Sequence, residues 1–198
     1  LIDCGGGERL ERWGDYILVR PDPQAIWTRN SKDPCWERYD AKYSRSNTGG
    51  GHWEKRRLPD IWQVRYRELT FNVKAMNFKH TGIFPEQAAH WDFIMKKIAM
   101  DKKPKHVLNL FAYTGAATVA ALAAGAKVTH VDASRQAIGY ARENQEASGL
   151  AGKPVRYMLD DVMKFCTKEL RRGVRYDGIV MDPPVYGHGP SGEKWSFG

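Results

Sequence analysis

Between residues 105 and 184, four short apolar runs alternate with three helix patterns. The runs read HVLNLFA, KVTHVDAS, VRYMLDD and YDGIVMDPP, and the helix patterns read TGAATVAALAAG, RQAIGYARENQEASG and VMKFCTKELRRG. Strands joined by helices lie parallel in one sheet, and near-continuous apolar runs indicate strands that are buried on both faces. The alternation therefore predicts an α/β fold with a doubly wound parallel sheet that is cut off after about its fourth strand.

The region that precedes this alternation has a different pattern. Residues 1–60 are rich in turn signals, and Tyr16–Val19 is the clearest strand among them. Two alternating runs, IWQVRY and ELTFNV, predict a hairpin over residues 61–73. We therefore predict a small, turn-rich and partly β segment over residues 1–60 and a main domain over residues 61–198.

The composition argues against several classes of protein. The sequence contains no stretch of about 18 apolar residues, as a membrane-spanning helix requires, and no basic leader followed by an apolar segment. Its three cysteines, Cys4, Cys35 and Cys166, are widely spaced and do not form metal-ligand pairs. We expect reduced thiols, a cytoplasmic protein and no metal site.

The net charge of +8 favours an anionic partner. Residues 1–106 contain 20 Lys and Arg against 14 Asp and Glu, so most of the positive excess lies in the first half of the chain. This balance is compatible with nucleic-acid binding and equally with a surface that is charged only for solubility. The best local candidate for RNA binding is Lys55-Arg56-Arg57, because Trp53 and Trp62 lie close to it in the sequence.

Glycine and acidic residues stand where the four predicted strands end. Gly115 follows the first strand, Asp132 ends the second, Asp160 and Asp161 end the third, and Asp182 follows the fourth. Ligands of open α/β sheets bind outside the carboxyl ends of the strands, and an acid after the second strand can accept hydrogen bonds from both hydroxyls of a ribose. The sequence therefore predicts a nucleoside cofactor site at this edge of the sheet.

The first loop distinguishes between cofactors. A dinucleotide site uses G-x-G-x-x-G, so that a pyrophosphate approaches a helix N-terminus. FAYTGAA has one glycine and two aromatic residues in this place. The loop favours a smaller nucleoside with an amino-acid tail, such as S-adenosylmethionine, over NAD.

Several stretches together resemble the class I S-adenosylmethionine-dependent ribosomal RNA methyltransferases. They are VLNLFAYTGAATVAALAAGA, VTHVDAS, ARENQEASGL, LDDVMKF and YDGIVMDPPVYG, and upstream of them RPDPQAIW, SNTGGGHWE and FKHTGIFPEQAAHWDF. The resemblance covers nearly the whole chain, and it is to the branch of bacterial 23S rRNA cytosine-C5 and guanine-N7 enzymes. It implies a Rossmann-like class I methyltransferase fold that binds S-adenosylmethionine.

The resemblance also implies which residues bind the cofactor. They are Gly82, Phe84 and Gln87 in HTGIFPEQ, Phe111, Tyr113 and Gly115 in the first loop, Asp132 and Ser134 after the second strand, and Asp160 and Asp161 after the third. Asp132 would bind the ribose diol. Either Asp160 or Asp161 would contact the adenine.

The stretch MDPPVYG would bind the acceptor base. The resemblance implies catalytic roles for Asp182, Pro183, Pro184 and Tyr186. Methyl transfer needs the nucleophilic atom in line with the sulfonium methyl group, so a loop stiffened by two prolines can hold the base in place. Asp182 would accept a hydrogen bond from the base, and Tyr186 would stack on its face.

The expected function is methyl transfer from S-adenosylmethionine to a base of RNA, in particular 23S rRNA. The alternatives are a methyltransferase acting on DNA, protein or a small molecule, and an RNA-binding module that keeps the cofactor fold without catalysis. A cytosine-C5 enzyme also needs a cysteine nucleophile, whereas Cys166 is better explained as a small buried residue. The methylated atom therefore stays open.

Overall fold

The computed structural model describes residues 1–30, 32–46, 50–76 and 79–196, and the chain forms two compact units. Unit 1 contains residues 1–65 and 72–83, and unit 2 contains residues 66–71 and 84–198. Residues 47–49 of SNTGGGHWE and Phe78 of FKHTGIFPEQAAHWDF lie outside the described residues. The domain boundary at residues 60 and 61 stays a prediction.

Unit 1 is built on a five-stranded sheet in the order β1-β2-β3-β4-β5. Its strands are β1 (Asp3–Gly5), β2 (Glu8–Trp13), β3 (Tyr16–Pro21), β4 (Ala41–Arg45) and β5 (Gly51–Lys55). Only the β3–β4 pair is parallel. The connection between β3 and β4 contains the 3-10 helix η1 (Pro34–Trp36), whose Trp36 packs with Leu10 and Val19 on one face of the sheet.

Two indole hydrogen bonds connect later segments of unit 1 to this sheet. The indole Nε1 of Trp62 donates to the carbonyl of Trp13 over 3.1 Å, and that of Trp53 donates to the carbonyl of Met76 over 2.8 Å. Two strands, β6 (Trp62–Tyr66) and β7 (Leu69–Val73), pair with each other, which confirms the predicted hairpin.

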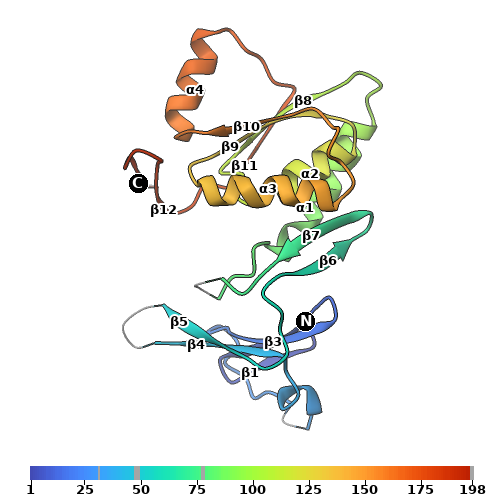
Figure 1. Ribbon diagram of the computed structural model, residues 1–198, viewed down its shortest axis with the longest axis vertical. Coiled ribbons are helices and arrows are strands. Elements are labelled where there is room, and N and C mark those ends of the chain that lie inside the picture. Colours follow the sequence, from blue (N-terminus) through green and yellow to red (C-terminus); the bar gives the residue numbers. More distant parts are fainter. Residues whose placement is uncertain (31, 47–49, 77–78, 197–198) are drawn as a thin grey trace. The chain divides into compact units, whose positions relative to one another are not determined.

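Unit 2 contains a four-stranded parallel sheet in the order β10-β9-β8-β11. The strands are β8 (His106–Leu110), β9 (Lys127–Asp132), β10 (Val155–Leu159) and β11 (Gly178–Met181), and the helices are α1 (Ala88–Ala99), α2 (Ala116–Ala123), α3 (Arg135–Ala147) and α4 (Val162–Arg171). Figure 1 shows α2 and α3 on one face of this sheet and α4 on the other. The predicted doubly wound α/β fold is confirmed.

Alternate residues of β8 point into two separate apolar cores. Val107 packs with Leu122 and Val128 in one core, and Leu108 packs with Val131 and Phe165 in the other. Each face of the sheet is therefore sealed by its own helices, as the near-continuous apolar run of β8 predicts.

The expectation of four buried strands is wrong for the two outer ones. Ile179 and Met181 of β11 are 63% and 62% exposed, and β10 is only partly buried. The sheet order explains this, because β10 and β11 are the edge strands and only β8 and β9 have neighbours on both sides.

Two further elements border the site described below. The 3-10 helix η2 (Pro85–Gln87) precedes α1 directly. Strands β12 (Tyr186–His188) and β13 (Lys194–Ser196) pair as an antiparallel hairpin, where the sequence predicted a loop around Tyr186. Among the described residues, no helix combines the length and the apolar character that crossing a bilayer would need.

A buried polar chain joins α2 to the central strands of unit 2. Asn109 donates to the hydroxyl of Thr118 over 2.9 Å, and this hydroxyl lies 3.0 Å from Nδ1 of His130. His130 is fully buried, and its Nε2 has no hydrogen-bond partner in the described part of the chain. Burial, with a smaller contribution from Arg142, lowers the pKa of His130 to about 3.

We expect this histidine to make the fold sensitive to acid. An unfolded histidine titrates near pH 6.5. Below that pH the unfolded chain binds a proton that the native His130 does not, so the free energy of unfolding falls by ~1.4 kcal/mol per pH unit until about pH 3. Denaturant unfolding of wild type and His130→Gln at pH 6.5, 5.5 and 4.5 should give a shallower pH dependence for the variant. The same slope in both proteins would contradict the assignment.

Candidate functional site

The candidate site lies at the carboxyl edge of the unit 2 sheet. Because β8, β9, β10 and β11 are parallel, the loops that follow them all emerge at this edge. These loops contain the predicted cofactor and acceptor residues, apart from those of HTGIFPEQ.

The loop after β8 has an unusual backbone. Phe111 and Tyr113 have φ angles of 52° and 51°, and Gly115 has a φ angle of 82°. Left-handed backbone costs a residue with a side chain about 1–2 kcal/mol, and such strain is characteristic of functional sites. Hydrogen bonds hold the loop in place, among them one from the amide of Ala112 to the carbonyl of Val131 over 3.1 Å.

Asp132, at the end of β9, fixes the same loop. One carboxylate oxygen accepts from the amide of Tyr113 over 2.7 Å, and the other accepts from the amide of Ser134 over 2.8 Å. Burial raises the pKa of Asp132, and these backbone donors oppose that effect. Each oxygen keeps a further lone pair, so the rigid carboxylate fits the two hydroxyls of a ribose.

The two acidic residues after β10, Asp160 and Asp161, have different partners. Asp161 is the N-cap of α4, and its side chain accepts from the amide of Lys164 over 2.9 Å. Asp160 accepts from the amide of Asp161 over 3.0 Å and from the ammonium of Lys168 over 2.6 Å. Asp161 is thus engaged as a helix cap, as is Ser134, whose hydroxyl accepts from the amide of Ala137 at the start of α3. Their roles toward a cofactor stay predictions.

The segment around η2 reaches two of the loops at the sheet edge. The ring of Phe84 packs against that of Tyr113, with the centroids 5.5 Å apart. The amide Nε2 of Gln87 donates to the carboxylate of Asp182 over 3.2 Å. The Oε1 of Gln87 in turn lies 2.5 Å from Nδ1 of His90. Gly82 has a φ angle of 104° and belongs to unit 1. Its role toward a cofactor stays a prediction.

The loop after β11 is held by a residue that the sequence analysis missed. The indole Nε1 of Trp195, on β13, donates to the carbonyl of Pro184 over 2.7 Å, and its ring packs on Phe111 with a centroid distance of 4.9 Å. Trp195 therefore connects the loop after β11 to the loop after β8. The signal in the sequence was an indole nine residues after Tyr186, but its value depends on the β12–β13 hairpin.

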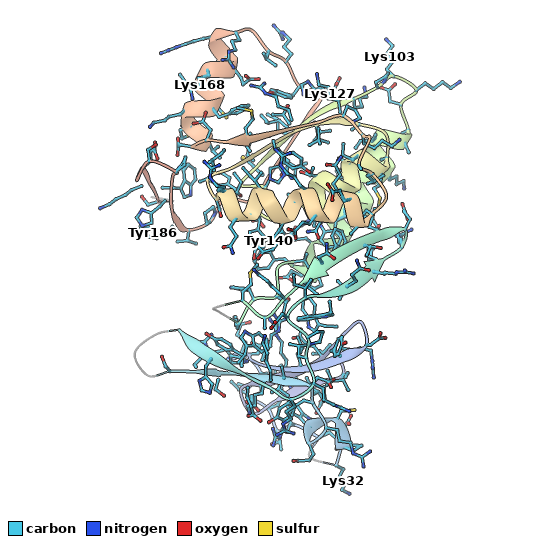
Figure 2. All side chains as sticks on the ribbon, viewed as in Figure 1. Lys32, Lys103, Lys127, Tyr140, Lys168 and Tyr186 are labelled. Atoms are coloured by element: carbon cyan, nitrogen blue, oxygen red, sulfur yellow. The ribbon has the colours of Figure 1, made fainter. Side chains whose placement is uncertain are left out.

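Tyr186 lies on this hairpin and is 59% exposed as a residue (Figure 2). Its hydroxyl lies 2.9 Å from Nε2 of His188. The exposed face leaves room for stacking. Cys166 is partly buried against the core of Phe165, and burial raises the pKa of its thiol, which does not suit a nucleophile.

Gly115 provides a test of the crowded loop. A Cβ on Gly115 would lie 2.8 Å from the Cβ of Ala141, whereas Gly125, at the other end of α2 with a φ angle of 93°, has open space. Both alanine variants incur the left-handed strain, but only Gly115→Ala adds a steric clash. We expect it to lower the free energy of unfolding by about 1–3 kcal/mol more than Gly125→Ala does. Denaturant titrations of both variants check this, and equal losses would contradict the crowding.

Comparisons with known proteins agree on one family. A family model described as S-adenosylmethionine-dependent methyltransferase matches residues 40–192. A crystal structure of a SAM-dependent methyltransferase from Agrobacterium tumefaciens is 44% identical, with a TM-score of 0.95 over 99% of this chain and 63% of that chain.

Two curated relatives are named as RNA enzymes. Ribosomal RNA large subunit methyltransferase I of Klebsiella pneumoniae subsp. pneumoniae is 45% identical over 83 residues, covering 41% of this chain and 21% of the relative. Ribosomal RNA large subunit methyltransferase K/L of Shewanella frigidimarina is 27% identical over 197 residues, covering 89% of this chain and 26% of the relative. The chain thus spans about a fifth to a quarter of the length of these curated relatives.

Proposed function

The chain belongs to the family of S-adenosylmethionine-dependent methyltransferases, and we propose that it methylates a base of RNA, in particular of 23S rRNA. The observation that supports this most is the hydrogen bond between Gln87 and Asp182. It joins a predicted cofactor residue to a predicted acceptor residue in one site. The cytoplasmic location expected from the three cysteines is part of the same proposal.

The residues at the sheet edge fit the cofactor of this family. When bound, S-adenosylmethionine supplies a methyl group on a sulfonium sulfur. Asp132 accepts the ribose hydroxyls with a carboxylate that two backbone amides already orient. The left-handed loop presents Phe111 and Tyr113, and Phe84 packs on the ring of Tyr113. Asp160 and Asp161 are the acids available for the adenine amino group.

The loop after β11 positions the acceptor base. Asp182 accepts a hydrogen bond from the base, and Gln87 holds that carboxylate in orientation. Pro183 and Pro184 restrict the backbone, and Trp195 fixes the carbonyl of Pro184. Tyr186 offers an exposed ring for stacking. These contacts contribute to the rate by holding the reacting atoms in line.

RNA is favoured as the substrate for two reasons. The curated relatives are named ribosomal RNA methyltransferases, and the net charge is +8. A methyltransferase of DNA, protein or a small molecule, or an RNA-binding module without catalysis, are the other outcomes of the experiments below.

Calorimetric titration with S-adenosylhomocysteine and, separately, with NAD tests the cofactor site. We expect binding of S-adenosylhomocysteine only, and loss of that binding in Asp132→Ala because the ribose loses its acceptor. The matched control is Asp101→Ala, which removes a surface acid paired with Lys105. Binding of NAD, or full affinity in Asp132→Ala, would overturn the assignment of the site.

Methyl transfer from labelled S-adenosylmethionine to rRNA transcripts tests the acceptor loop. Asp182→Asn should reduce the rate by about 100-fold or more, because the base loses a charged acceptor that positions it. Affinity for S-adenosylhomocysteine should stay at the wild-type level. An unchanged rate would remove Asp182 from the proposed machinery, and methylation of another class of substrate instead of RNA would select the alternative.

A further inference from the structure

The basic cluster that the sequence suggested for RNA binding is largely neutralised within unit 1. Each of its three side chains has an acidic partner, in the pairs Lys55–Asp60 at 2.8 Å, Arg56–Glu54 at 3.1 Å and Arg57–Asp40 at 3.0 Å. Arg56 also lies over the ring of Tyr39. The unbalanced positive charge of unit 1 must therefore be sought elsewhere.

A second group of cations lies at one end of the same sheet. Arg9 and Arg20 are directly opposite each other on β2 and β3. Arg20 is 4% exposed, and each of its three guanidinium nitrogens donates a hydrogen bond, two of them to the carboxylate oxygens of Glu11 and one to the carbonyl of Lys79. Its plane also lies over the ring of Trp13. Glu11 is therefore committed to Arg20.

Arg9 is left without a strong partner. Its Nε lies 3.6 Å from the carboxylate of Glu11, and its Nη1 lies 3.9 Å from that of Asp22, which are both too long for hydrogen bonds. The Nε is buried, and it has no hydrogen-bond partner in the described part of the chain. A buried donor in this state favours an acceptor from outside the protein.

Two more cations surround Arg9. The carbonyl of Lys79 accepts from Arg20 over 3.0 Å, which fixes the Lys79 backbone beside the arginine pair. Arg45 ends β4, the strand next to β3. Burial is the main cause that lowers the pKa of the Lys79 ammonium, and the charges of Arg9 and Arg45 lower it further. The structure shows no ion pair of Lys79 or Arg45 with a described residue.

We propose that Arg9, Arg45 and Lys79 form an anion site that binds a phosphate group of the RNA backbone. The nearby acids are Asp22, at 3.9 Å from Arg9, and Glu11, which is paired with Arg20. The three cations therefore keep an excess of positive charge that suits a phosphate, and the guanidinium of Arg9 supplies directed donors for its oxygens. A phosphate contact does not distinguish between nucleotide sequences, so the site contributes to the affinity for RNA and to the orientation of the bound RNA. The identity of the anion as RNA rests on the proposed function.

The test compares two double variants that each remove two positive charges. Arg45→Ala/Lys79→Ala removes the two cations that form no ion pair with a described residue, and it spares Arg9, which lies on β2. Arg12→Ala/Lys32→Ala is the control. Arg12 lies on β2 three positions after Arg9, so the alternation of side chains along a strand places it on the opposite face. Lys32 lies beside η1 (Figure 2). Binding of a fluorescein-labelled rRNA stem–loop is followed by anisotropy between about 50 and 200 mM salt.

We expect the site variant to bind this RNA about tenfold more weakly than wild type, and the slope of log affinity against log salt to become shallower by about 1–2. The control variant should lose clearly less. Circular dichroism and binding of S-adenosylhomocysteine should be unchanged in both variants, which verifies that both fold.

Other outcomes separate the two proposals. If wild type binds RNA and the site variant matches the control variant, the anion site is refuted while the proposed function stands. If wild type binds no RNA but binds S-adenosylhomocysteine, both the anion site and the RNA substrate fail, and the cofactor assignment remains.

Discussion

The candidate site depends on one carboxylate, that of Asp132, which binds two backbone amides at once. One amide belongs to the strained loop after β8, and the other belongs to Ser134, the N-cap residue of α3. The carboxylate therefore joins the loops of two neighbouring strands before any ligand arrives. Partial burial of this charge raises the pKa of Asp132, and the backbone amides oppose that effect. The same group that shapes the site is the one that we expect to recognise the ribose.

The sequence predicted those parts of unit 2 that depend on local patterns. The four strands, their helices, Gly115 and the acids at the strand ends follow from alternating apolar runs and from the geometry of parallel sheets. β11 is more exposed than expected, because in this structure it pairs on one side, with β8. Trp195 was missed because its contacts with Pro184 and Phe111 exist only after the chain folds back as a hairpin.

Unit 1 shows the same limit for charge. The sequence located the positive excess in the first half of the chain but selected Lys55, Arg56 and Arg57, which are adjacent in sequence. In the folded unit these side chains have acidic partners. Arg9 and Lys79 are 70 positions apart in the sequence, and pairing of strands brings them to one place. A cluster of basic residues in the sequence therefore does not show where unpaired positive charge lies on the folded surface.

The left-handed backbone of Phe111 and Tyr113 also affects how the protein responds to selection. Glycine or asparagine at these positions would relieve strain, so a screen for thermal stability would enrich such replacements. Each replacement would remove a ring that packs on Trp195 or on Phe84. Variants selected for stability alone would therefore fold well but lack the rings of Phe111 and Tyr113. Engineering of this scaffold should therefore select for ligand retention together with heat resistance.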